Sequence, residues 1–367
     1  MDITAAVATE IGGPFTLSTV TLDPPRADEI LVRIAGVGLC HTDLAAKDGH
    51  LPFPIPGVFG HEGSGEVVEI GSAITKVKPG DKVALSFDSC GRCDQCRAGE
   101  PSYCHEFMAV NFGGARPDGT TALHGDGQDI GSGFFGQSSF ATHALAHERN
   151  VVKVPDDAPL AVLGPLGCGV QTGAGAVLNS LNCPPGSSLL VLGGGSVGLS
   201  SVLAAVVREL GEIIVVEPHA GRRDLALALG ATHALDPADG PLSEQVRGLL
   251  PDGVDHAIDT TGVVAVLEQA MLSLAHRGKL GIIGVPADPN AALPVNLIQA
   301  QVLGVTITGI VEGDSDPDVF IPQLLELHRV GRFPFDKLIT TRPFSEINEA
   351  VTAQRNGEAV KIVLVHG

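Results

Sequence analysis

The sequence contains no tryptophan and a single tyrosine, so phenylalanine, with 13 copies, supplies nearly all of its aromatic side chains. Basic residues are scarce as well: 23 lysines and arginines face 42 aspartates and glutamates, and the formal net charge is -19. Nucleic acids and anionic membranes bind basic patches, so we expect neither as a partner. Long apolar runs are missing, which argues against membrane spans. The first residues, MDITAAVATEIGG, lack the basic region of a signal peptide.

The composition does provide for large cores. Hydrophobic residues make up 44% and charged residues 18% of the chain, which argues against disorder. A length of 367 residues is sufficient for two domains of ordinary size. There are seven cysteines, and an odd number without a signal peptide does not fit a disulfide framework. We therefore expect a cytoplasmic protein with reduced cysteines.

The first part of the chain is rich in short strand patterns. Residues 29–38, 62–71, 81–88 and 140–154 carry many β-branched side chains and are bounded by glycine, proline or aspartate. Glycines and prolines are dense between these segments. The pattern predicts a β-rich, barrel-like domain with long loops.

The pattern changes near residue 170, where strands begin to alternate with helices. Strands are predicted at 187–195, 212–217, 233–236, 254–261, 279–285 and 305–311, and helices at 196–210, 222–229, 243–250 and 264–276. Such alternation predicts a parallel sheet, and six strands is the count of a doubly wound dinucleotide-binding (Rossmann) fold. We therefore predict a β-rich domain over 1–170, completed by 312–367, and a Rossmann domain over 171–311.

A glycine-rich turn follows the first of these strands. Gly193, Gly195 and Gly198 fit the pattern G-x-G-x-x-G at the start of a helix, and Glu217 ends the next strand. The glycines permit a tight turn and a close approach of the pyrophosphate, which the helix N-terminus attracts. Glu217 can bind the adenosine ribose and would repel a 2′-phosphate, so NAD is favoured over NADP. The arginines 222–223 weaken this preference.

Four cysteines stand close together in SCGRCDQCRAGEPSYC: Cys90, Cys93, Cys96 and Cys104. Four thiolates from one loop can close a tetrahedral zinc site with no open position, which is typical of a structural site. Iron–sulfur clusters also use four cysteines, but the ferredoxin run has a shorter last interval followed by proline. The spacing therefore predicts a structural zinc that holds a loop.

The other three cysteines are scattered. Cys40 opens CHTD, Cys168 lies in GPLGCGVQTG, and Cys183 has no partner pattern, which indicates a spare buried thiol. His61 stands between them in GHEGSGEV. Two cysteines and a histidine can form a catalytic zinc site with one open position. The spacing alone leaves ligands and ordinary buried residues equally open.

Taken together, these motifs resemble one known family. GLCHTD, GHEGSGEV, the four-cysteine segment, GPLGCGVQTGAGA and GGGSVGL occur here in the order typical of the zinc-dependent medium-chain alcohol dehydrogenases. Within that family, FFGQSSFATHAL, GIVEGDSDPDVFIPQLLEL and GRFPFDKLI resemble the aryl-alcohol (benzyl alcohol) dehydrogenase branch. The resemblance implies an α/β protein with a GroES-like catalytic domain and a Rossmann domain, and two Zn²⁺ per chain.

The resemblance also implies roles for individual residues. Cys40, His61 and Cys168 would hold the catalytic zinc, and Cys90, Cys93, Cys96 and Cys104 the structural one. Thr42 would hold the substrate hydroxyl, Asp43 would orient His61, and Glu62 would lie behind the metal. The implied cofactor contacts are His41, Gly193, Gly195, Val197, Gly198, Glu217, Arg222, Val285, Ile310, Glu312 and Lys361, with Lys361 at the pyrophosphate; the implied substrate wall is Phe134 and Phe135, with Ser86 or Phe87 opposite.

The implied activity is reversible hydride transfer between a primary aromatic or allylic alcohol and NAD, giving the aldehyde. The alternatives are a dehydrogenase of aliphatic alcohols, polyols or glutathione-bound formaldehyde, or a non-catalytic dinucleotide-binding protein. Ala45 occupies a position where many relatives have a proton-relaying histidine, so we expect His41, or else His50, in that role. The resemblance further implies a homodimer or homotetramer.

Overall fold

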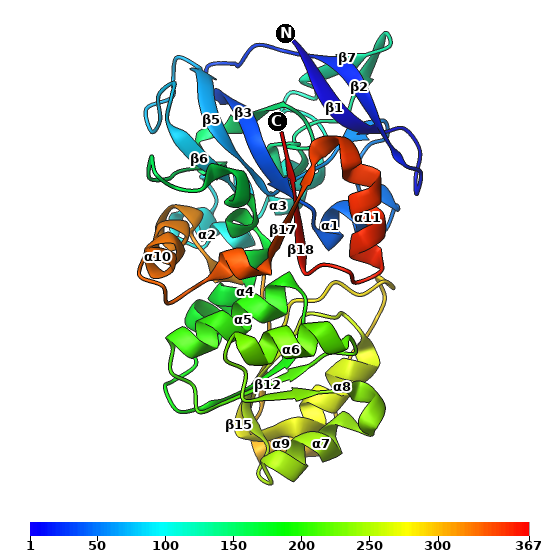
Figure 1. The fold of residues 1–367 in the computed structure, drawn as a ribbon, viewed down its shortest axis with the longest axis vertical. Coiled ribbons are helices and arrows are strands. Elements are labelled where there is room, and N and C mark those ends of the chain that lie inside the picture. The colour runs from blue at the N-terminus through cyan, green and yellow to red at the C-terminus, as the bar shows by residue number, and fades with distance from the viewer. Residues whose placement is uncertain (367) are drawn as a thin grey trace. The chain divides into compact units, whose positions relative to one another are not determined.

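The chain forms two compact units, which are described separately. The computed structural model describes residues 1–366 (Figure 1). The first unit comprises Met1–Gly169, Asp316–Glu326 and the chain from Ile339 onward, and the second comprises Val170–Ser315 and Leu327–Leu338. We expected residues 312–315 and Leu327–Leu338 in the first unit, but both group with the second. In the second segment, for example, the Arg332 guanidinium donates to the Val207 carbonyl at 2.9 Å.

The first unit contains two β-sheets. The larger has the order β10 (Val151–Lys153), β6 (Lys82–Leu85), β5 (Gly63–Ile70), β3 (Glu29–Gly38), β18 (Lys361–Val365) and β17 (Ile339–Pro343), and β9 (His143–His147) also pairs with β3. The smaller has the order β4 (Gly57–Val58), β1 (Asp2–Ala8), β2 (Phe15–Leu22), β7 (Leu123–Gly125) and β8 (Gln128–Ile130). Its helices are α1 (His41–Lys47), α2 (Asp94–Arg97), α3 (Phe107–Phe112), α10 (Pro317–Arg329) and α11 (Ile347–Arg355).

The strand predicted over 140–154 is two strands. A short turn at Glu148–Asn150 separates β9, which pairs with β3, from β10, which pairs with β6. The β1–β2 hairpin was not predicted from the sequence. Burial alternates only in part of the hairpin: Ile3 is buried between exposed Asp2 and Thr4, and Val20 and Leu22 are buried on either side of exposed Thr21, whereas Ala5–Ala8 are all buried.

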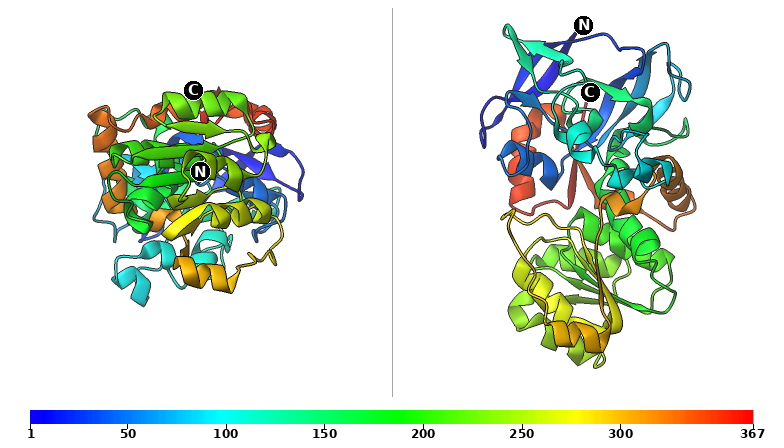
Figure 2. Two further views of the ribbon diagram at one scale, coloured as in Figure 1. Left: turned by 90° about the horizontal axis from the view of Figure 1, so that it is seen from below. Right: turned by 180° about the vertical axis from the view of Figure 1, so that it is seen from behind.

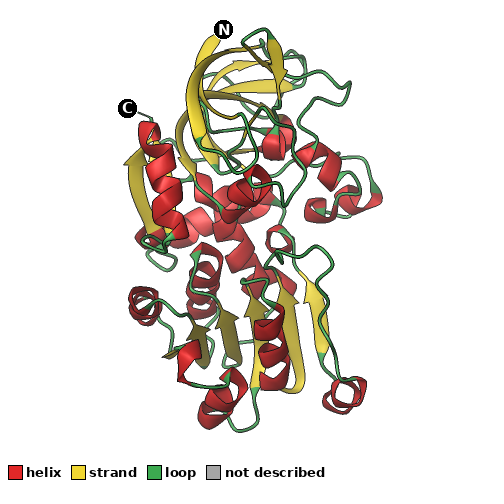
Figure 3. Ribbon diagram, turned by 90° about the vertical axis from the view of Figure 1, so that its right-hand side faces the viewer, coloured by secondary structure: helices red, strands yellow, loops and turns green. Residues whose placement is uncertain are grey.

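The second unit is built on a six-stranded parallel sheet. Its order is β13 (His233–Leu235), β12 (Glu212–Val216), β11 (Ser188–Leu192), β14 (Val254–Asp259), β15 (Leu274–Ile282) and β16 (Thr306–Gly309). Its helices are α4 (Gly169–Gly175), α5 (Ser196–Val207), α6 (Ala220–Ala228), α7 (Leu242–Leu249), α8 (Val264–Ser273) and α9 (Leu297–Leu303). Helices lie on both faces of the sheet (Figures 2 and 3), and β11 is buried along its whole length. The predicted doubly wound fold is confirmed.

One boundary in this sheet differs from the prediction. The helix predicted over 264–276 ends at Ser273, and β15 starts at Leu274 rather than near residue 279. The pairing with β14 shifts register between Leu274 and Lys279, and Arg277 has a φ of 64°. The extra residues of this irregularity conceal the start of the strand in the sequence. No helix among residues 1–366 has the length and hydropathy that a membrane crossing requires.

Candidate metal centres and dinucleotide turn

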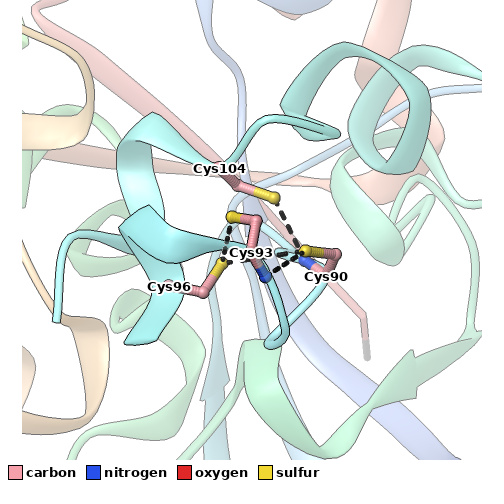
Figure 4. A group of neighbouring side chains, drawn as sticks. All are labelled: Cys90, Cys93, Cys96 and Cys104. Carbon is pink, nitrogen blue, oxygen red and sulfur yellow. Dashed lines mark hydrogen bonds between the residues drawn. The ribbon is translucent and has the colours of Figure 1, made fainter. Parts of the chain in front are cut away.

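The four clustered cysteines converge in the first unit. Their sulfur atoms all lie within 4.8 Å of one another, around α2 (Figure 4). Backbone N–H groups donate to the sulfurs: that of Cys90 to Cys104 at 3.2 Å, and that of Cys93 to Cys90 at 3.4 Å. Hydrogen bonds of this kind stabilise thiolates. The donor set therefore fits a closed, four-thiolate zinc site, as the spacing predicted.

A second cluster lies elsewhere in the same unit. Cys40 caps the N-terminus of α1, His61 lies between β4 and β5, and Cys168 follows the short helix Gly164–Gly167. Together with Glu62, each offers a donor atom within 4.8 Å of the others. Residues more than 120 positions apart in the sequence thus form one cluster. Two thiols and an imidazole are a recognised donor set for catalytic zinc.

The carboxylate of Asp43 fixes the ring of His61. Its Oδ1 lies 2.8 Å from Nδ1 of His61 and accepts the Gly60 N–H at 3.0 Å, while Oδ2 accepts the Cys40 N–H at 2.9 Å. The bond to Asp43 places the ring proton on Nδ1. The other nitrogen, Nε2, is buried without a hydrogen-bond partner among the described residues. This orphaned atom is what a metal ligand requires, so the cluster fits zinc.

Electrostatics favour positive charge in this cluster. A hydrogen bond from Cys168, with the charges of Lys361 and His61, lowers the pKa of the Cys40 thiol well below its usual range although burial opposes it. Burial acts to lower the pKa of His61, but Asp43 and Cys40 outweigh it and hold that pKa well above its usual value. Anionic groups gathered away from water are stabilised by a cation.

Glu62 forms a buried ion pair behind the thiols. Its two carboxylate oxygens lie 2.7 and 2.9 Å from the Lys361 ammonium, and both side chains are buried. Burial raises the pKa of Glu62, and Lys361 opposes this. Gly38 permits the close packing, because a Cβ there would lie 1.9 Å from a Glu62 oxygen.

This arrangement differs from the role expected for Lys361. A contact with a pyrophosphate requires an ammonium group that a ligand can reach. Here Nζ of Lys361 is enclosed, bonded to Glu62 and to the Leu39 carbonyl at 3.2 Å. Lys361 is the first residue of β18, and its ammonium lies next to Glu62 of the metal cluster. Lys361 therefore balances the charge of Glu62 in this structure.

The side chains around the cluster are hydroxyl and aromatic groups. The Thr42 hydroxyl lies 3.7 Å from the Cys40 sulfur, and His41 is exposed at the start of α1. The Phe135 ring stacks on the His61 ring, with centroids 4.4 Å apart and planes at 25°. Phe134 approaches the same ring edge-on at 5.5 Å.

The three phenylalanines expected in the substrate wall are all buried. Phe134 is fully buried, and its ring packs edge-on against Phe59 and Phe112. Phe87 contacts Phe107. Phe134 thus belongs to the aromatic core, whereas Phe135 lies directly on a metal-ligand candidate. Their role as a substrate wall remains a prediction.

The glycine turn of the second unit joins β11 to α5. Gly193 has a φ of 100°, which favours glycine, and a Cβ on Gly198 would lie 1.9 Å from the Gly193 carbonyl oxygen. A Cβ on Gly195 would meet no atom within 4 Å, so that backbone faces open space. Val197 lies in the first turn of α5. These features fit a backbone that a pyrophosphate can approach closely.

The Glu217 carboxylate organises the backbone of this turn. It accepts the Gly194 N–H at 2.7 Å and the His219 N–H at 2.9 Å. Arg222 lies 4.0 Å from the same carboxylate. Arg223 is held by Asp236 at 2.9 Å and by the Glu217 carbonyl at 2.7 Å, so it is already engaged. The turn therefore fits NAD better than NADP.

The remaining predicted cofactor positions belong to the second unit. Ile310 is buried, its N–H donates to the Ile282 carbonyl at 2.9 Å, and Val285 is 55% exposed. Glu312 is buried with a φ of 51°, and its carboxylate accepts from the Gln171 amide at 3.1 Å. Their contacts with a nicotinamide remain a prediction. Sequence reasoning did not find Gln137, whose amide bonds the His61 carbonyl at 2.9 Å. Its only signal was its place in FFGQSSF.

Substitution of Cys93 by serine should separate the two metal centres. We expect zinc to fall from two to one per chain, and the free energy of unfolding to drop by about 2–4 kcal/mol, because metal binding is coupled to folding of the segment. Metal analysis measures the zinc content, and thermal unfolding measures the loss of stability. Cys183→Ser is the control: this thiol is buried outside both clusters, so zinc content should stay at two. Two zinc ions in Cys93→Ser would contradict the assignment.

Comparison with known proteins agrees with this geometry. Residues 26–156 match the family model described as "Alcohol dehydrogenase GroES-like domain", and residues 196–327 match "Zinc-binding dehydrogenase". The chain is 51% identical over 363 residues to geraniol dehydrogenase of Castellaniella defragrans, covering 98% of this chain and 97% of that protein.

Two solved structures share the whole fold. Benzyl alcohol dehydrogenase from Acinetobacter calcoaceticus superposes with a TM-score of 0.97 at 41% identity, with 100% of each chain covered. An alcohol dehydrogenase zinc-binding domain protein from Burkholderia ambifaria gives 0.97 at 45% identity, covering 100% of this chain and 99% of that one. The motifs, the fold and the metal donors lead to one conclusion: this chain belongs to the zinc-binding alcohol dehydrogenase family, with a GroES-like domain and a Rossmann domain.

Proposed function

We propose that this protein oxidises primary aromatic or allylic alcohols to aldehydes, reversibly, with NAD as the hydride acceptor. The observation that carries the proposal is the convergence of Cys40, His61 and Cys168 within 4.8 Å beside the Thr42 hydroxyl. Relatives named for geraniol and for benzyl alcohol support the substrate class. Bound zinc supplies Lewis acidity toward an alcohol oxygen, and bound NAD supplies the hydride acceptor.

The residues of the chain supply orientation and a proton path. Thr42 Oγ1, beside Cys40, is placed to accept the proton of an alcohol hydroxyl. Threonine cannot retain that proton at neutral pH, so a titrating group must follow, and exposed His41 is adjacent in sequence. Phe135 covers one face of His61 and excludes water from it.

The aromatic surroundings favour large, flat alcohols. Phe135 is buried next to the metal-ligand candidates, stacked on the His61 ring, and apolar aromatic surroundings at this place suit benzyl and conjugated groups better than polar ones. Polyols and glutathione conjugates instead require polar or charged groups in the pocket, which makes them the weaker alternatives. A non-catalytic dinucleotide-binding protein would have no use for the oriented His61 and its orphaned Nε2.

A substrate panel tests this function. We expect kcat/KM for benzyl, cinnamyl and geranyl alcohols to exceed that for ethanol and sorbitol by about tenfold or more, because apolar contacts add to transition-state binding. NADH formation measures the rate. Cys168→Ala should remove one zinc and nearly all turnover while the fold persists. Cys183→Ser, the control, should retain two zinc ions and full turnover. Preference for ethanol or sorbitol would contradict the substrate class, and full activity of Cys168→Ala would contradict the site.

Glu217→Gln tests the choice of cofactor. The carboxylate bonds Gly194 and would repel a 2′-phosphate, so its neutralisation should raise KM for NAD by about tenfold and narrow the preference over NADP. Glu212→Gln is the matched control, because Glu212 begins β12 whereas Glu217 directly follows the end of that strand. Tighter NADP than NAD binding by the unmodified protein would refute the assignment.

The chain is also proposed to form a homodimer or homotetramer in the cytoplasm. Residues 297–311, which include α9 and the edge strand β16, contain no charged side chain in a chain of net charge -19. Leu297, Ile298 and Val302 of α9 are 79%, 74% and 69% exposed. An uncharged apolar edge is where two copies of an acidic protein repel least. None of the seven cysteines forms a disulfide, which suits a reducing compartment.

Sedimentation velocity tests the association. We expect an oligomer for the unmodified chain and a monomer for Ile298→Asp, because a charge on the apolar edge must be desolvated on contact. Val319→Asp, at an exposed apolar position on α10, should leave the oligomer intact. A monomeric unmodified protein, or dissociation by Val319→Asp alone, would contradict the proposed interface.

A further inference from the structure

A strained turn in the first unit holds Gln137 inside the protein. In the segment Gly133–Ser138, the non-glycine residues Phe135 and Ser138 have φ angles of 51° and 55°. Such backbone costs free energy and persists only where the surroundings hold it, often beside functional sites. Gln137 lies between these two residues and is only 2% exposed.

The amide of Gln137 ties several backbone segments together. Its Nε2 donates to the His61 carbonyl at 2.9 Å and to the Ser86 carbonyl at 3.0 Å. Its Oε1 accepts the Gly63 N–H at 3.0 Å and the Ser139 hydroxyl. All the donors and acceptors of the amide are thereby engaged. Two of the four bonds go to the segment that contains His61.

Ser86 continues the connection toward another metal-ligand candidate. Its hydroxyl donates to the Gly167 carbonyl at 2.7 Å, directly before Cys168 in the chain. Gly167 lies so close to this strand that a Cβ would stand 1.8 Å from the Leu85 carbonyl oxygen. A short hydrogen-bonded path therefore runs from the His61 segment through Gln137 and Ser86 to the Cys168 segment.

We infer that Gln137 is a positioning residue that sets the separation of His61 from Cys168 through Ser86. Asp43 already joins Cys40 to His61. The Asp43 carboxylate and the Gln137 amide together therefore connect the three segments that carry Cys40, His61 and Cys168. Such preorganisation raises metal affinity, since less ordering remains to be done on binding. The inference rests on the proposed zinc site. It adds to that site a residue whose amide bonds the backbone of the ligand segments and not the atoms that would bind zinc.

Gln245 provides a matched control. Its amide also donates to two backbone carbonyls, those of Asp236 and Gly240, each at 3.0 Å. It lies in the second unit, away from both cysteine clusters. The change Gln245→Met therefore removes the same two donations without touching a metal-ligand segment.

The test compares Gln137→Met with Gln245→Met after loading with Co²⁺, which reports ligand geometry through its visible absorption. We expect Gln137→Met to shift the absorption of the two-thiolate site, to release that metal to a chelator about 10–100-fold faster, and to lower kcat with KM for NAD unchanged. Gln245→Met should leave the spectrum and the release rate unchanged. If Gln137 had a purely structural role, both variants would unfold at a lower temperature, and neither would change the Co²⁺ absorption or the rate of metal release.

Ser86→Ala is the second variant, in case Gln137→Met does not fold. It removes the hydroxyl bond to Gly167 and keeps the backbone carbonyl that accepts from Gln137, and it should also speed metal release. In the double variant the effects on the release rate should be less than additive, because both residues act along one path. An unchanged rate of metal release in Ser86→Ala, or an unchanged Co²⁺ absorption in Gln137→Met, would overturn this inference and leave the proposed function intact. An unmodified protein without metal at this site would overturn the proposed function, and the inference with it.

Discussion

The buried carboxylate of Asp43 is the group on which the catalytic cluster depends. It receives two backbone N–H groups and the His61 ring, and so joins the start of α1 to the segment before β5. The three bonds engage both oxygens of this buried carboxylate. The two segments it joins provide Cys40 and His61, so their side chains converge because one anion fixes both backbones.

Charge balance explains the second layer of the site. Two cysteine sulfurs, the Glu62 carboxylate and Asp43 are gathered with the Lys361 ammonium and the His61 ring. Buried charges persist only when they are paired. Lys361 compensates Glu62, and a divalent cation on the sulfurs and His61 would compensate much of the rest. The same charge balance explains why Lys361, which was expected to contact the cofactor pyrophosphate, is bonded to Glu62 instead.

The sequence predicted best those features that local rules control. The glycine turn at Gly193, the alternation of strands and helices, and the spacing of Cys90, Cys93, Cys96 and Cys104 each follow from short-range geometry. The scattered ligands were found only through the family resemblance, since spacing carries no information on contacts across more than 120 residues. Gln137 was missed because its partners are backbone carbonyls, and every residue in the chain has one.

Each unit uses a buried carboxylate to shape a candidate ligand site. Asp43 accepts the backbone of Cys40 and Gly60 in the first unit, and Glu217 accepts that of Gly194 in the second. Asp43 also orients the His61 ring, and Glu217 is the residue proposed to bind the adenosine ribose. The two tasks are coupled: a ribose hydroxyl that binds Glu217 must share it with the Gly194 N–H. The carboxylate proposed to select the cofactor is therefore also the one that holds the backbone of the glycine turn.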